Sequence, residues 1–296
     1  MVFELNLKSC LIQALKTARI IILVVIPYYL LAETLLYFDL MQHVAFIFTP
    51  ISTILNLPAE AALVIAAGVF LNVYAAIAFA APLELTVYDW TVLGLFLGVL
   101  HSIPVESTIL KSIGISWRFS VTLRTSMAFV IVLPLFLLPE SWFFTDPDLI
   151  KTGFHYVTPV PNHGFWLFFA YKAFDALILA LQIIVLVSVI ILFNEIVKNL
   201  KILQKFNHHL TLIVSLITGF FIGITYGAGI LIKESKNLNR QQVMAVCCFL
   251  MVCHAIIEDT LLFVIFGANI YVLVIFRLIL STIIFFLVYF WYARKG

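Results

Sequence analysis

The sequence predicts an all-α fold, a polytopic membrane bundle of two inverted repeats with about eight transmembrane or re-entrant helices. First, 64% of the residues are hydrophobic, only 11% are charged, and the mean hydropathy is +1.15, values far outside those of soluble domains. Second, apolar stretches of about 20 residues, the length that spans a bilayer, recur from end to end of the chain. Third, polar residues recur in one register in the two halves.

The apolar stretches give the order of the expected elements. They predict helices near residues 20–37, 61–81, 92–103, 121–138, 167–194, 210–232, 243–266 and 271–291. An amphipathic start and the stretch 38–57, which contains Pro50, are expected to lie at the membrane interface, and the proline-rich, acidic stretch 139–165 is expected to be an aqueous loop. The chain therefore divides into an interfacial segment (1–16), a first membrane repeat (17–138), an external loop (139–165) and a second membrane repeat (166–296).

Basic residues predict the orientation, because cytoplasmic loops carry an excess of lysine and arginine. They flank the first helix, follow the fifth and end the chain, at Lys8, Lys16, Arg19, Lys198, Lys201, Lys205, Arg294 and Lys295. This pattern predicts a multi-pass protein of the bacterial inner (cytoplasmic) membrane with cytoplasmic N- and C-termini.

Each half must then cross the membrane an odd number of times, although each has four apolar stretches. We therefore expect one stretch per half to be broken or re-entrant, with the short one ending at His101 as the first candidate. Irregular backbone at membrane depth is tolerated only where it lines a cavity or is buried in protein. The crossing count thus predicts a binding site.

Composition also excludes several partners. The net charge is +2, and neither a Walker loop nor a dinucleotide fingerprint is present, so we expect no nucleic-acid partner and no cofactor. The expected partners are the lipid bilayer and a small-molecule or ion substrate, and a chain of this size is compatible with a homo-oligomer.

Polar and glycine positions match between the halves at an offset of 153 residues. The matched pairs are His101 and His254, Glu106 and Asp259, Gly114 and Gly267, and Arg124 and Arg277. Such a set in one register is hard to obtain by chance, so we infer a duplication. Together with the odd crossing count, it predicts two halves of opposite orientation, the arrangement common in secondary transporters.

The duplicated ionisable residues are the main candidates for a site. A charged side chain at the bilayer centre costs about 2.5–3.5 kcal/mol on insertion scales, so such groups face a partner or a wet cavity. The predicted substrate- or proton-binding set is His101, Glu106, His254, Glu258, Asp259, Arg124, Arg277, Asn72, Tyr74, Thr225 and Tyr226. A second interpretation remains open, in which the arginines only neutralise the carboxylates as buried ion pairs and the histidines are hydrogen-bonded helix contacts.

A metal site is a weaker prediction. Cys247, Met251, His254 and Glu258 fall along one helical stripe and offer suitable ligands. Because glycines replace the first two in the other half, the stripe is not duplicated, and a Gly-xxx-Gly face is typical of close helix packing. We therefore predict no dedicated metal site, with His254, Glu258 and Asp259 as the alternative ligands.

Two segments carry a family resemblance. Residues 225–229 (TYGAG) and 253–263 (CHAIIEDTLLF) resemble the signature of bacterial membrane proteins with a gate, or nucleoside-recognition, domain. Related gate modules occur in ferrous-iron transporters, spore-maturation membrane proteins and concentrative nucleoside transporters, and the resemblance covers most of both halves. It implies a helical pore or carrier with inverted repeats. The GTPase domain of the iron transporters and their cysteine-containing pore motif have no counterpart, so the resemblance assigns neither iron nor nucleosides as substrate.

These observations favour a secondary transporter or permease whose midplane polar site is built from both repeats. Its substrate would be a small polar solute, a nucleoside-like molecule or an ion, and histidine also suits proton coupling. The alternatives are an intramembrane hydrolase acting on lipid phosphates, since histidine, carboxylate and arginine can bind and attack a phosphoryl group, and a divalent-metal permease. A non-transporting subunit that recruits a partner through Lys198, Lys201 and Lys205 is a further alternative. No catalytic residues are predicted, since no hydrolase motif is found.

Overall fold

The computed structural model describes residues 7–139, 143, 164–198 and 211–294, and within them the only regular elements are helices. It confirms the all-α, polytopic membrane fold. Helices long and apolar enough to cross a membrane are Cys10–Tyr37, Val87–Ser112, Trp117–Leu137, Phe165–Phe193, Arg240–Val264 and Ile270–Ala293.

The first half begins with one long helix, which is followed by short helices and then by the central elements. They are α1 (Leu7–Tyr37), α2 (Met41–Ala45), α3 (Thr49–Ile54), α4 (Ala61–Phe70), α5 (Val73–Ala80), α6 (Val87–Leu100), α7 (Ile103–Ser112), α8 (Trp117–Val132) and the 3₁₀ helix η1 (Leu133–Leu137). The second half repeats this order as α10 (Phe165–Lys198), α12 (Thr211–Ser235), α13 (Arg240–Val252), α14 (Ile256–Val264) and α15 (Ile270–Ala293).

Each half contains one folded-back pair of short helices. In the first half the chain turns between α4 and α5, and a Cβ placed on Gly68 would lie 3.2 Å from that of Ala76, so the two arms run side by side. In the second half α12 is folded at Gly223, whose φ of +88° requires glycine. Here a Cβ on Gly227 would lie 3.3 Å from the Thr218 side chain.

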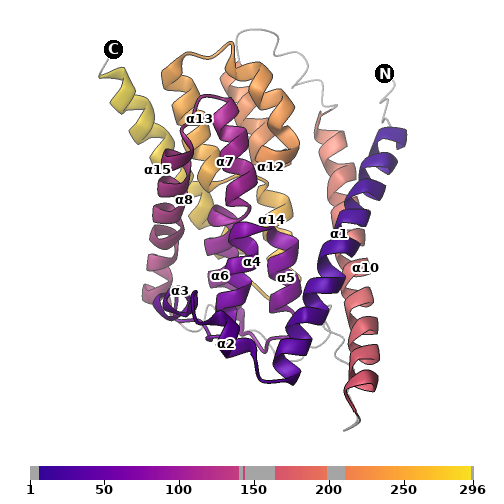
Figure 1. Ribbon diagram of the computed structural model, residues 1–296. Helices are drawn as coiled ribbons and strands as arrows, with labels where there is room; N and C mark the ends of the chain where they lie inside the picture. The colour runs from indigo at the N-terminus through magenta and orange to yellow at the C-terminus, as the bar shows by residue number, and fades with distance from the viewer. Residues whose placement is uncertain (1–6, 140–142, 144–163, 199–210, 295–296) are drawn as a thin grey trace.

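The two halves have opposite orientations. In Figure 1 the chain rises from α6 into α7 but descends from α13 into α14, and the α4–α5 pair approaches from the opposite end to α12. The beginning of α1 and the end of α15 lie at the same end of the bundle. Three crossings and one folded-back pair per half satisfy the odd crossing count.

The first candidate for the re-entrant segment was only partly right. The stretch ending at His101 is broken, but the chain continues in the same direction as α7 and completes the crossing (Figure 1). The folded-back element is instead α4 with α5, which the sequence presents as one apolar run, 61–81. The hairpin was missed because only two residues, Leu71 and Asn72, separate its arms.

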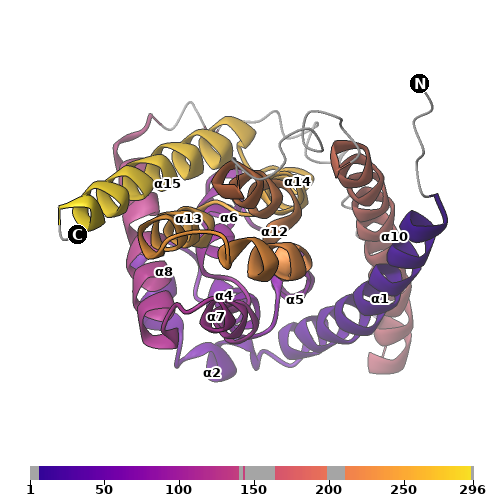
Figure 2. The same ribbon diagram turned by 90° about the horizontal axis from the view of Figure 1, so that it is seen from above.

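Two broken helices form the centre of the bundle. In the α6–α7 and α13–α14 spans, 78% of the most apolar 18-residue stretch is buried inside the protein. The corresponding share in the other four spans is 28–39%. Figure 2 shows α1 with α10 on one side of this centre and α8 with α15 on the other. The polar residues His101, Glu106, His254 and Asp259 of these broken helices are buried.

The ends of the predicted segments shift. Residues 7–16, expected in a separate interfacial segment, form the first turns of α1, because nothing in the sequence breaks the helix there. The stretch 38–57 forms α2 and α3, two short helices beside the bundle (Figure 1). Most of the predicted loop 139–165 lies outside the described residues, as do Lys201 and Lys205.

Candidate functional site

Each central helix breaks at a histidine. His101 ends α6 with φ −69° and ψ 160°, and the next residue, Ser102, is left-handed with φ +50°. At the equivalent place after α13, His254 is followed by Ala255 with φ +44°. This region costs a non-glycine residue about 1–2 kcal/mol, and such strain clusters at functional sites.

The breaks are held by the folded-back helices. The Ser102 amide donates to the Gly68 carbonyl over 2.9 Å, and the Ala255 amide donates to the Gly219 carbonyl over 3.3 Å. Both acceptors are glycines because the helices approach closely. A Cβ on Gly68 would lie 2.7 Å from the Leu97 side chain, and one on Gly219 would collide with Leu250.

The histidine rings are fixed by backbone carbonyls. Nδ1 of His101 lies 2.7 Å from the Leu97 carbonyl, and Nδ1 of His254 lies 2.7 Å from the Leu250 carbonyl. A carbonyl oxygen only accepts, so both Nδ1 atoms carry hydrogen. In the neutral rings both Nε2 atoms therefore present lone pairs.

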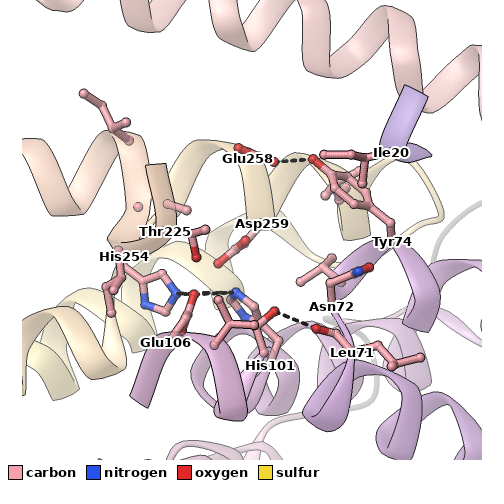
Figure 3. Close-up of a pocket in the computed structure, with 18 residues that line it drawn as sticks. Ile20, Leu71, Asn72, Tyr74, His101, Glu106, Thr225, His254, Glu258 and Asp259 are labelled. Carbon is pink, nitrogen blue, oxygen red and sulfur yellow. Dashed lines mark hydrogen bonds and ion pairs between the residues drawn. The ribbon is translucent and has the colours of Figure 1, made fainter. Parts of the chain in front are cut away.

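The two rings meet each other and Glu106. Their Nε2 atoms lie 3.4 Å apart. Glu106 Oε1 lies 3.1 Å from Nε2 of His254 and 3.4 Å from Nε2 of His101. Figure 3 shows these side chains pointing toward one another from the two halves. The repeat has thus brought its duplicated imidazoles to one point.

Arg124 supports this cluster from behind. Its NH1 lies 2.7 Å from Glu106 Oε2, and its Nε and NH2 donate to the carbonyls of Val99 and His101 over 2.7 Å. These carbonyls lie in the last turn of α6 and at its C-cap, where the helix break removes the N–H donors of a following turn. The side chain is fully buried.

Arg277 repeats this role in the second half and adds a bond to the first. It donates to Asp259 Oδ2 over 3.1 Å, to the His254 carbonyl over 2.7 Å and to the Val252 carbonyl over 3.4 Å. NH2 also donates to the Gly98 carbonyl over 3.0 Å, which crosses between the repeats. A Cβ on Gly98 would lie 3.2 Å from the Arg277 guanidinium carbon.

A cavity of about 230 Å³ lies beside the cluster and is lined by both repeats. The predicted residues in its lining are Asn72, Tyr74, His101, Glu106, Thr225, His254, Glu258 and Asp259. The two arginines are outside the lining, and the Tyr226 side chain is outside the described part of the structure. The cavity reaches the surface, since Ile20, Leu71 and Val105 in its lining are exposed.

The remaining predicted polar residues hold the cavity walls. The Tyr74 hydroxyl donates to Glu258 Oε1 over 2.6 Å, which joins α5 to α14 across the repeats (Figure 3). Asn72 caps α5 by accepting a bond from the Ala75 amide over 2.9 Å. Neither contact has a counterpart at the matching position of the other half, where Val105 replaces the glutamate. The two sides of the cavity therefore differ chemically.

The stripe considered for a metal is not assembled. Cys247 and Met251 are buried but do not line the cavity. The α13 helix ends at Val252, so His254 and Glu258 do not share a helical face with them. Within the described residues, the possible ligand side chains that do converge are His101, Glu106 and His254.

One buried ionic cluster was missed in the sequence. Lys172 Nζ lies 2.8 Å from Glu33 Oε1 and 3.7 Å from Asp175 Oδ2, and the cluster joins α10 to α1. All three side chains are buried. Their position inside apolar stretches was the available signal, because such charges need partners.

The fold and this site define a polytopic α-helical membrane protein whose two inverted halves share one polar cavity. The chain is similar to a protein of Bacillus subtilis (strain 168) described as the uncharacterized membrane protein YvoD. The two are 26% identical over 274 residues, which cover 88% of this chain and 86% of that protein. No protein-family model matches the chain, and no solved structure matches it.

Proposed function

We propose that this protein is a secondary transporter or permease that binds its cargo in the cavity between the two broken helices. The observation that carries the proposal is the meeting of His101 and His254, each at a helix break, at the contact between inverted repeats. In transporters of this architecture, broken helices place the cargo site at the repeat interface, near the bilayer midplane.

The cavity volume limits the cargo. Pockets for drug-sized ligands measure about 300–1,000 Å³, whereas this cavity measures about 230 Å³. It has room for an ion with part of its hydration shell or for a small polar solute. The volume favours these over a nucleoside-like molecule.

The charge of the lining favours a cation and disfavours the hydrolase alternative. Glu106, Glu258 and Asp259 line the cavity, and none of the described residues in its lining is a lysine or arginine. A phosphoryl site built from side chains alone needs arginine or lysine groups that face it. Arg124 and Arg277 are instead committed to backbone carbonyls and carboxylates.

The gate-domain resemblance supports the same proposal, since it implies a pore or carrier of inverted repeats. We place the protein in the bacterial inner membrane with both termini in the cytoplasm. The distribution of basic residues supports this orientation, and so does the common end of the bundle at which α1 begins and α15 ends (Figure 1). The partner-recruiting alternative rests on Lys198, Lys201 and Lys205, two of which lie outside the described residues.

Flux measurements in proteoliposomes test the proposal. The probes are Zn²⁺ with a trapped fluorescent chelator, protons with a trapped pH dye, and radiolabelled uridine. We expect the wild type to carry at least one probe faster than protein-free vesicles, and His254→Ala and Asp259→Asn to lose that flux. His43→Ala, which changes an exposed histidine of α2, is the control and should keep it. Equal flux through the wild type and both cavity variants, or no flux of any probe, would overturn the proposal.

A further inference from the structure

Three hydrogen-bond acceptors converge at the centre of the bundle. In the neutral rings the Nε2 atoms of His101 and His254 carry lone pairs, because each Nδ1 hydrogen is used by a carbonyl. Glu106 Oε1 is the third acceptor. Three lone pairs directed at one buried point repel one another unless a proton or a metal ion lies between them.

The separations of these atoms match the coordination sphere of a metal ion. The three distances are 3.1, 3.4 and 3.4 Å. A tetrahedral Zn²⁺ with bonds of about 2.0–2.1 Å places neighbouring ligand atoms about 3.3–3.4 Å apart. A nitrogen-to-nitrogen hydrogen bond of 3.4 Å would be long, since N–H bonds in proteins cluster near 2.9–3.0 Å.

We propose that His101 Nε2, His254 Nε2 and Glu106 Oε1 bind a divalent transition-metal ion of the Zn²⁺ type. This inference rests on the proposed function in one respect only. If the protein is a transporter, the bound ion represents the class of its cargo. The binding itself can be measured whether or not the protein transports.

The surroundings of the three ligands are those of a metal site. Histidines that ligate metals donate their other ring N–H to a carboxylate, a carbonyl or water, which fixes the ring. Both histidines do so here, to the carbonyls of Leu97 and Leu250. A ligating carboxylate is also held by an outer-shell partner, and here Arg124 forms an ion pair with Glu106 Oε2 at 2.7 Å.

The ligand types select among metals. Imidazole and carboxylate suit Zn²⁺ and its first-row neighbours, whereas Ca²⁺ and Mg²⁺ prefer all-oxygen sites and Cu⁺ prefers sulfur. Cys247, Cys248 and Cys253 are buried but do not line the cavity.

All three ligand residues line the cavity, so a further ligand of the ion would come from the cavity side. Zinc sites with three protein ligands keep the fourth position for water or a further group, whereas closed four-ligand sites are structural. The cavity reaches the surface, so an ion can enter without unfolding of the bundle. Both features suit a metal ion that is carried rather than retained.

Metal binding to the purified protein tests the proposal. The full chain is prepared in detergent without a polyhistidine tag, stripped with a chelator and titrated with Zn²⁺ by calorimetry. The wild type should bind one ion per chain at this site. His254→Ala and Glu106→Gln should weaken that binding by more than the roughly 10–100-fold that loss of an outer-shell partner costs. Unchanged binding in these variants, or no Zn²⁺ binding by the wild type, would refute the site.

Two controls address other histidines. His43→Ala changes an exposed side chain, and a second control replaces the adjacent His208 and His209 with alanine. Both should retain the ion. If binding disappears with either control and not with His254→Ala, the ion is adventitious and the proposal fails.

A measurement on the wild type alone tests the site even if the variants do not fold. X-ray absorption of the zinc-loaded protein should show two imidazole ligands and oxygen. Sulfur in the first shell would contradict the proposed ligands. Zn²⁺ binding without any flux would overturn the transport proposal and leave the metal site, whereas uridine flux without Zn²⁺ binding would do the reverse.

Discussion

Replacing Arg124 with methionine is expected to destabilise the protein far more than the same change at Arg118 in the same helix. Arg124 is fully buried, whereas Arg118 is exposed. The loss of Arg124 leaves the Glu106 carboxylate without its cation, and breaking a buried ion pair costs about 3–5 kcal/mol. The carbonyls of Val99 and His101 also lose their donors, at about 1–3 kcal/mol for each buried group left unsatisfied. The expected loss is therefore at least about 3–5 kcal/mol, compared with about 0.5 kcal/mol or less for a surface change.

Equilibrium unfolding in mixed micelles with a rising fraction of dodecyl sulfate measures this difference. Tryptophan fluorescence is a suitable signal, because Trp90 in α6 is only 1% exposed. Adding Glu106→Gln to the Arg124→Met variant removes the stranded charge. The double variant should therefore lose less stability than the sum of the single losses, by about 0.5–3 kcal/mol. If Arg124→Met and Arg118→Met cost the same, the account of the arginine as a cap and counter-charge is wrong.

Two further outcomes follow from packing and charge. Gly219→Ala should lower the stability by about 1–3 kcal/mol because the new Cβ would collide with Leu250. Gly229→Ala in the same helix should not do so, since nothing lies within 4 Å of its Cβ position. Equal unfolding curves for the two variants would contradict this expectation. Lys172→Met should cost about 3–5 kcal/mol because it removes the cation that lies 2.8 Å from the buried Glu33 carboxylate. A variant as stable as the wild type in the same unfolding assay would refute that role.

The repeat was accessible from the sequence because it rests on unusual residues in a common register. The offset that pairs His101 with His254 also pairs Leu97 with Leu250, the two residues whose carbonyls hold the rings. It likewise pairs α6 with α13 and α8 with α15. A polar residue in an apolar span needs a polar partner or a wet cavity. Its recurrence in both halves therefore predicts the same local surroundings in both halves.

The break at His101 was predicted, but the turn within residues 61–81 and the break at His254 were not accessible in the same way. The run 61–81 has the length and composition of a single span, and only Asn72 interrupts its apolar character. The stripe through Cys247 and Met251 assumed a continuous helix, but α13 ends at Val252. The convergence of His101, His254 and Glu106 depends on how the halves pack against each other, which no periodicity along one helix contains.

The bond from Arg277 to the Gly98 carbonyl makes the two buried arginines respond differently to a movement of one half against the other. The bonds of Arg124 to Val99, His101 and Glu106 all stay within the first half, so a rocking of one half against the other leaves them intact. The same rocking must release Arg277 from Gly98 and separate the two imidazoles. Arg277 is thus one of several polar contacts that join the two halves, together with the Tyr74–Glu258 and His254–Glu106 contacts. An ion held by both imidazoles would oppose the separation of the halves.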